Sequence, residues 1–131
     1  MSDLGRRAAL LALPAYWILL FVATHYPRVA IPGEIPHSDK LIHFTAFGLL
    51  AFLFWQFVRA RRPIGPRFVW ISGVALIIYA AFDEFLQQFV GRFTDPVDFV
   101  ANATGIVVVL AVLELLRRRR NRRSAERPAV R

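Results

Sequence analysis

Four long apolar runs, separated by short charged segments, constrain the fold of this chain more than any other feature. A helix that crosses the hydrocarbon core of a membrane needs about 20 residues, and each run comes close to that length. Inside lipid, a helix satisfies its own backbone hydrogen bonds, and the chain lacks the alternating pattern of a membrane-spanning strand. We therefore predict an all-α, four-helix transmembrane bundle with short loops, with helices at about residues 8–26, 39–58, 68–90 and 97–116.

Charged residues are kept apart from these runs, and this excludes an ordinary soluble domain. The 131 residues are 56% hydrophobic, yet they include 17 basic and 9 acidic residues, for a net charge of +8. The absence of cysteine excludes a disulfide framework and thiolate chemistry. The first run has no small-residue cleavage site, so we expect a retained helix rather than a signal peptide. We interpret residues 1–116 as one membrane domain and residues 117–131 as an arginine-rich tail.

The basic residues predict the orientation of the bundle. Fourteen of the 17 lie before the first run, between the second and third, or after the fourth; the other three are Arg28, Lys40 and Arg92. Cytoplasmic loops carry an excess of Lys and Arg, so both termini are expected in the cytoplasm (N-in/C-in). The tail is expected to contact anionic lipid head groups. Because no aromatic residues are interleaved with its arginines, no nucleic-acid partner is expected.

Polar residues gather at the opposite side of the predicted bundle. Tyr79, Asp83 and Gln87 are spaced four apart and share one face of the third helix. An unpaired carboxylate at the depth of Asp83 costs at least about 2.5–3.5 kcal/mol in a membrane. We therefore expect Asp83 to pair with Lys40, Arg92 or His43, or to carry a proton.

The beginnings of the second and fourth helices contribute further polar groups. Asp39 and His43 are four residues apart and are neighbours on one helix surface. Asp39, and Asp95 before Pro96, are candidate N-caps. Asp98 and Asn102 share a face of the fourth helix, which we expect to point toward the third.

Three spaced motifs carry a resemblance to a known family: D-K-x-x-H-F from Asp39, D-E-x-x-Q from Asp83, and R-x5-D-x3-N-x2-G from Arg92. Together they resemble the VanZ-like family over residues 36–110. The resemblance implies a small bacterial inner-membrane protein associated with teicoplanin and other glycopeptide resistance or with envelope stress. The polar signature of the family maps onto nine residues, which we take as candidate ligand-binding residues: Asp39, Lys40, His43, Asp83, Glu84, Gln87, Arg92, Asp98 and Asn102.

Three functions remain open at this point. In the first, the outer-side residues bind a lipid head group or a lipid-linked envelope precursor. Lys40 and Arg92 then contact phosphate, and the carboxylates hold those cations or bind sugar hydroxyls. In the second, the chain is an enzyme with candidate catalytic residues His43, Asp83 and Glu84. These residues work in acid–base catalysis, or join Asp98 around a divalent metal such as Mg²⁺ or Mn²⁺.

In the third, the protein is a structural or assembly module whose polar pairs fix helix packing. Small residues at Gly48, Gly73, Ala75 and Gly105 offer surfaces of close approach for an oligomer. A transport function is not expected, because the polar residues gather at one end and do not continue toward the cytoplasmic side.

Overall fold

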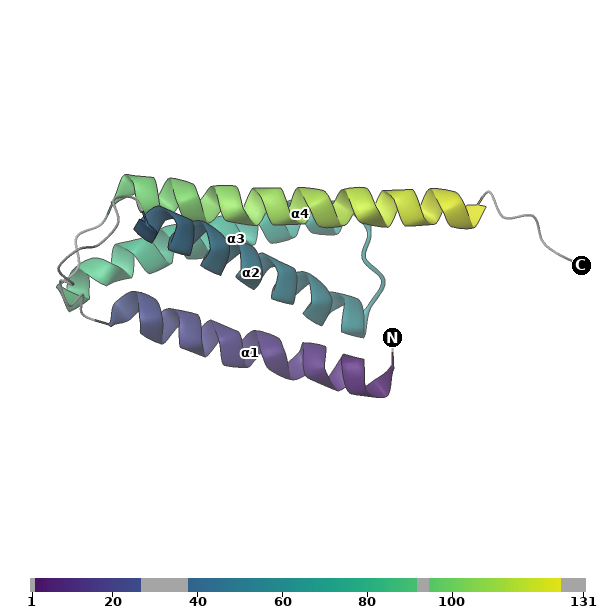
Figure 1. The fold of residues 1–131 in the computed structure, drawn as a ribbon, viewed down its shortest axis with the longest axis horizontal. Helices are drawn as coiled ribbons and strands as arrows, with labels where there is room; N and C mark the ends of the chain where they lie inside the picture. Colours follow the sequence, from purple (N-terminus) through teal and green to yellow (C-terminus); the bar gives the residue numbers. More distant parts are fainter. Residues whose placement is uncertain (1, 27–37, 92–94, 126–131) are drawn as a thin grey trace, which may run out of the picture.

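The chain forms four long helices and one short 3-10 turn, as the computed structural model in Figure 1 shows. The structure describes residues 2–26, 38–91 and 95–125, and these ranges contain no strand. The elements are α1 (Asp3–His25), α2 (Ser38–Arg61), α3 (Pro66–Gln87), η1 (Gln88–Val90) and α4 (Pro96–Ala125). The prediction of an all-α, four-helix fold is confirmed.

All four helices are long and apolar enough to cross a membrane. Large apolar side chains cover the outside of the bundle, among them Ile18 and Trp70, which are 68% and 77% exposed. Soluble monomers rarely expose continuous apolar surface of this extent, whereas lipid chains solvate it. The protein is therefore a multi-pass membrane protein.

The helix ends differ from those expected because of local capping and propensity. α1 begins at Asp3, earlier than expected, since the Ser2 hydroxyl accepts a hydrogen bond from the Gly5 N–H at 3.2 Å. α4 continues past Leu116 to Ala125. Arginine is a good helix former, and cations near a helix C-terminus are favoured by the macrodipole. The first part of the arginine-rich segment is therefore helical.

α2 and α4 approach each other closely at Gly48 and Gly105. A Cβ atom at Gly105 would overlap the carbonyl oxygen of Phe44, and one at Gly48 would lie 3.2 Å from Val109 Cγ2. Two of the small residues expected to serve an oligomer thus bring helices together within one chain. The two helices diverge toward the end of the bundle that holds both chain termini (Figure 1).

The buried core is formed by all four helices, and α1 contributes Leu13 and Leu20 to it. Phe47, Leu50, Ala80 and Ile106 are fully buried. α1 is joined to α2 by a hydrogen bond from the Tyr16 hydroxyl to the Ala46 carbonyl at 2.9 Å. Because successive helices run in opposite directions, the C-terminal ends of α1 and α3 meet the N-terminal ends of α2 and α4 (Figure 1).

We predict that Gly105→Ala destabilises the bundle, because its methyl group cannot fit against the Phe44 carbonyl. Overpacking of this kind costs about 1–3 kcal/mol and lowers the unfolding temperature in detergent. Gly73→Ala is the matched control, since its Cβ would meet only Leu110 Cδ1 at 3.6 Å, an ordinary contact. An equal loss of stability in both variants would contradict the assigned contact.

The absence of native cysteine allows a direct test of the predicted orientation. Ser2, Gln88 and Ser124 are exposed and lie near helix ends. A membrane-impermeant maleimide should label Gln88→Cys in intact cells. Ser2→Cys and Ser124→Cys should react only after permeabilisation, because the arginine-rich end stays in the cytoplasm. Labelling of either serine variant in intact cells would refute the N-in/C-in orientation.

Candidate functional site

Lys40, in the first turn of α2, is held by three carboxylates. Its Nζ lies 3.0 Å from Asp39 Oδ2, 2.5 Å from Asp95 Oδ2 and 2.5 Å from Asp98 Oδ1. An ammonium group has three N–H donors, and here each faces a carboxylate. The arrangement fastens the start of α2 to the start of α4 and leaves the ammonium fully engaged.

Asp95 joins three helices. Its Oδ1 accepts a hydrogen bond from the Val97 N–H at 2.8 Å, so the predicted N-cap of α4 is confirmed. Its own N–H donates to Glu84 Oε1, at the end of α3, at 2.8 Å. The hydrogen bond from Lys40, aided by the one from Val97, holds the pKa of Asp95 below its ordinary value.

His43 and Asn102 form a buried polar pair between α2 and α4. His43 Nδ1 lies 3.1 Å from Asn102 Oδ1, and its Nε2 lies 3.5 Å from Asp98 Oδ2. A hydrogen bond between these two atoms requires Nδ1 to donate, because an amide oxygen only accepts. Asn102 is completely buried, and its Nδ2 has no hydrogen-bond partner among the residues that the structure describes.

This pairing corrects an expectation from the sequence. Asp98 and Asn102 make their hydrogen bonds to α2, because they lie within two turns of Gly105, where α4 is in contact with the α2 backbone; Asp98 also lies near Glu84 of α3. They do point the same way, as the four-residue spacing requires. The direction in which that face turns was decided by the glycine contact.

Asp83 is completely buried and is held both from α1 and from its own helix, α3. Thr24 Oγ1 donates to Asp83 Oδ1 at 3.2 Å, and His25 Nδ1 lies 3.8 Å from the same oxygen. Tyr79 and Gln87 donate to this carboxylate from one turn away, at 3.4 and 3.3 Å, so the predicted stack on α3 is confirmed.

Of the partners expected for Asp83, Lys40 and His43 instead contact Asp98, and Arg92 lies outside the described residues. Thr24 and His25 were not among the predicted site residues. The one sequence feature that could have identified Thr24 and His25 is their position at the polar end of the first apolar run.

One aromatic contact places α1 against α3, and a second, within α1, orients the His25 ring. The Trp17 ring meets the Tyr79 ring edge-to-face, with centroids 5.0 Å apart. Phe21 stacks on His25, whose Nδ1 also lies 2.9 Å from the Phe21 carbonyl oxygen. These contacts fix the end of α1 where Asp83 needs hydrogen-bond donors.

Glu84 connects the groups around Lys40 and Asp83. Its Oε1 accepts from the Asp95 N–H, and its Oε2 accepts from Gln87 Nε2 at 3.4 Å. His43, Asp98 and Asp83 are all close enough to act on it electrostatically. One continuous polar network therefore closes this end of the bundle.

The structure brings together every predicted ligand residue that it describes. One group, between the starts of α2 and α4, consists of Asp39, Lys40, His43, Asp98 and Asn102. The other, at the end of α3, consists of Asp83, Glu84 and Gln87. The ninth, Arg92, lies outside the described residues. Their ligand-binding role remains a prediction.

The candidate metal set of His43, Asp83, Glu84 and Asp98 is not assembled. In residues 2–26, 38–91 and 95–125, no three His, Asp or Glu side chains are placed to hold a metal ion. Asp98 contacts Lys40, while Asp83 is directed to α1. Of the candidate catalytic residues, His43 and Glu84 lie near each other, and Asp83 has its own partners.

The contact with Lys40 predicts how Asp95 titrates. Lys40→Met should raise the pKa of Asp95 toward the ordinary aspartate value of about 3.9, because it removes the cation that favours the charged form. Since the folded-state pKa is lowered, this carboxylate stabilises the fold above about pH 3.9 and loses that effect as the pH falls through the folded value.

Carbon-detected NMR of labelled aspartate in micelles measures this shift directly. Arg119→Met removes a cation from the other end of the protein and should leave the Asp95 titration unchanged. The same titration in wild type and Lys40→Met would show that the contact is not maintained.

Comparison with known proteins agrees with the resemblance seen in the motifs. The sequence profile of the VanZ/LLP1 family matches residues 6–117. A protein of the fission yeast Schizosaccharomyces pombe, described as uncharacterised, is 32% identical over 108 residues. The match covers 81% of this chain and 65% of the length of the relative. No solved structure is significantly similar. Because the family profile covers the four helices and the polar network, the chain belongs to the VanZ/LLP1 family.

Proposed function

We propose that this protein binds the head group of a membrane lipid at its carboxylate-rich end, through hydroxyl or ammonium groups of that lipid. We call this end the acidic end; its carboxylates are Asp39, Asp83, Glu84, Asp95 and Asp98. They outnumber the single lysine among them. A carboxylate oxygen can accept more than one hydrogen bond, so these groups retain acceptor capacity beyond the contacts described, and the complementary ligand is one that donates hydrogen bonds. This excess of acceptors is the observation that carries the proposal.

Lys40 has a positioning role in this proposal. Its three donors face three carboxylates, so binding a phosphate would first require one of these ion pairs to break. Lys40 therefore keeps the carboxylates together, and contact with a phosphate falls to Arg92. The buried Asn102 Nδ2, unpartnered within the described ranges, supplies a donor for a ligand oxygen.

Membership of the VanZ/LLP1 family supports a more specific ligand. We propose that the protein resides in a bacterial inner membrane with its acidic end on the outer side. There it binds a lipid-linked envelope precursor, whose sugars offer hydroxyl donors, and thereby modulates susceptibility to glycopeptide antibiotics such as teicoplanin. The yeast relative favours a head-group class that is not restricted to bacteria.

Native mass spectrometry of the protein with defined lipids tests the proposal. Phosphatidylethanolamine and a diglucosyl lipid carry donors, whereas the quaternary ammonium of phosphatidylcholine has none. The wild-type protein should retain the first two in preference to the third. Because a hydrogen bond to a charged group contributes about 1.5–3 kcal/mol, Glu84→Gln should weaken their retention by about tenfold or more.

Glu114→Gln is the matched control. Glu114 is also a buried carboxylate on a helix, but it lies at the opposite end of the bundle, paired with Arg117 and Arg118. Its substitution should leave retention unchanged in protein of verified helicity. Equal retention of phosphatidylcholine, or equal losses in the two variants, would refute the proposal. Release of a cleaved head group would instead favour the acid–base enzyme.

A further inference from the structure

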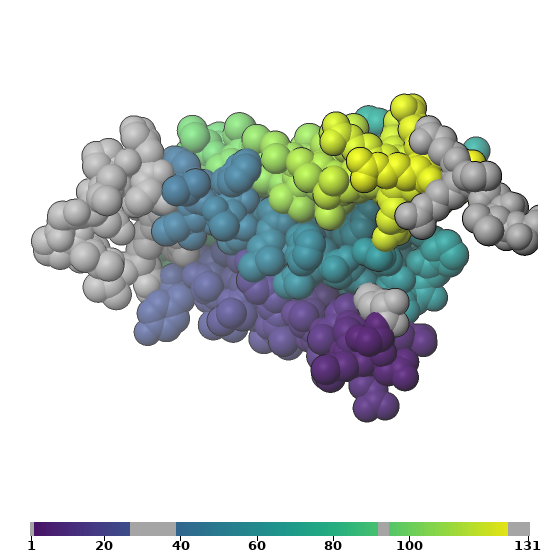
Figure 2. Space-filling view, turned by 45° about the vertical axis from the view of Figure 1, so that its right-hand side comes forward, coloured from purple at the N-terminus to yellow at the C-terminus, as the bar shows by residue number. Residues whose placement is uncertain are grey.

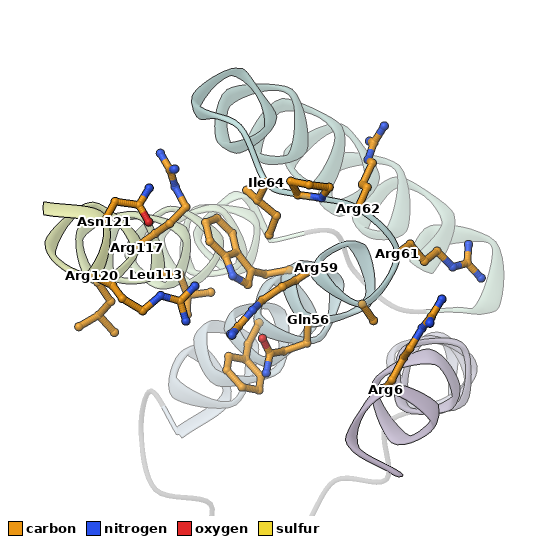
Figure 3. Close-up of a pocket in the computed structure, with 15 residues that line it drawn as sticks. Arg6, Gln56, Arg59, Arg61, Arg62, Ile64, Leu113, Arg117, Arg120 and Asn121 are labelled. Carbon is orange, nitrogen blue, oxygen red and sulfur yellow. The ribbon is translucent and has the colours of Figure 1, made fainter. Parts of the chain in front are cut away.

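A concave site lies at the end of the bundle opposite the acidic end. It is a cavity of about 790 Å³ between the end of α2, the connection to α3, the later turns of α4 and the start of α1 (Figure 3). Figure 2 shows this end of the molecule turned forward, with α1 and α4 bordering residues of α2 and α3. Pockets for small ligands measure about 300–1,000 Å³, so the cavity has room for one.

The walls of this cavity are strongly basic. Six of the 15 lining residues are arginines: Arg6, Arg59, Arg61, Arg62, Arg117 and Arg120. No lining residue is acidic. We call this site the arginine cavity. Its arginines come from α1, α2, the connection that follows α2, and α4, so the tertiary fold and not one local charge run assembles it.

Most of this positive charge is not neutralised within the described part of the chain. There, Arg117 is the only lining arginine with a carboxylate partner, Glu114, at 2.7 Å. Glu114 is also paired with Arg118 at 2.7 Å, outside the cavity, so its charge is shared. Arg61 lies over the Phe57 ring at 3.9 Å, a contact that leaves its charge in place.

Apolar side chains complete the cavity. Trp55 is 4% exposed, and Phe52, Ile64, Leu113 and Leu116 also line the space. In Figure 3, Arg59 and Arg120 extend toward one another from α2 and α4, with Gln56 beside them. Guanidinium groups bind phosphate oxygens through paired, charge-assisted hydrogen bonds. A phosphate between these arginines would relieve the repulsion among like charges, and an attached apolar group would meet Trp55.

We propose that the arginine cavity is a binding site for a phosphate-bearing ligand. Arg59 and Arg120 contact the phosphate, and Trp55 and Leu113 contact an adjoining apolar group. This combination fits a membrane lipid with a phosphate monoester or diphosphate better than a soluble phosphate. The site differs from the acidic end in position, charge and ligand chemistry, so each can fail without the other.

The test measures binding of short-chain phosphatidic acid to the full-length protein in phosphatidylcholine nanodiscs. Arg59→Gln/Arg120→Gln should weaken binding by about tenfold or more, since each guanidinium contributes charge-assisted hydrogen bonds. Arg119→Gln/Arg122→Gln removes the same charge from the same end of the protein, at positions that do not line the cavity. This control should change binding by less than about twofold, because these side chains do not line the cavity and cannot form paired hydrogen bonds to a phosphate held there.

Two further measurements test whether the ligand is a lipid or a soluble phosphate, and whether Arg59 binds the phosphate through its planar guanidinium group. Inorganic pyrophosphate should fail to displace the lipid at equal concentration, whereas full displacement would overturn the lipid assignment in favour of a soluble phosphate. Arg59→Lys keeps the charge and the fold but lacks the planar fork, so it should also weaken binding. Equal losses in the cavity variant and the control, or unchanged binding in both, would overturn the proposed site.

Discussion

The contact between α2 and α4 is the constraint on which the other features depend. Apolar helices gain little from associating in lipid unless their backbones approach closely or polar groups pair across them. Gly48 and Gly105 provide the close approach, since Gly105 lies directly against the Phe44 carbonyl. The ion pairs of Lys40 with Asp95 and Asp98 provide the polar pairing a few turns away. Together they fix the rotation and the spacing of the two helices at one end.

The fixed contact of α2 and α4 near the acidic end also determines how these helices are spaced at the opposite end. α2 and α4 diverge beyond the glycine contact (Figure 1). Residues of both helices, Trp55 among them, line the arginine cavity. The bundle therefore carries an excess of carboxylates at one end and of guanidinium groups at the other. An N-in/C-in orientation would place the arginines against the anionic lipids of the cytoplasmic leaflet.

α1 is the least buried of the four helices, yet it contributes hydrogen bonding to Asp83, the most deeply buried acid among the described residues. Thr24 and His25 bring polar groups to Asp83, and Trp17 packs on the neighbouring Tyr79. Removing a buried carboxylate from water is costly unless hydrogen bonds replace its hydration. Asp83 therefore favours the docked position of α1, and the family match, which begins at residue 6, includes this helix.

The sequence alone determined the number of helices and the clustering of polar residues at one end. A helix that crosses the hydrocarbon core needs about 20 apolar residues, so the four apolar runs predict four membrane-spanning helices. The four-residue spacing of Tyr79, Asp83 and Gln87 likewise required a shared helix face, and the structure confirms it.

Only the tertiary structure decided which side chains pair across helices. Periodicity places Asp98 and Asn102 on one face but cannot give the rotation of α4, which the glycine contact sets. The partner of Asp83 on α1 depended in the same way on how that helix docks. A helix sequence defines its own polar face, but the direction of that face follows from the packing of neighbouring helices.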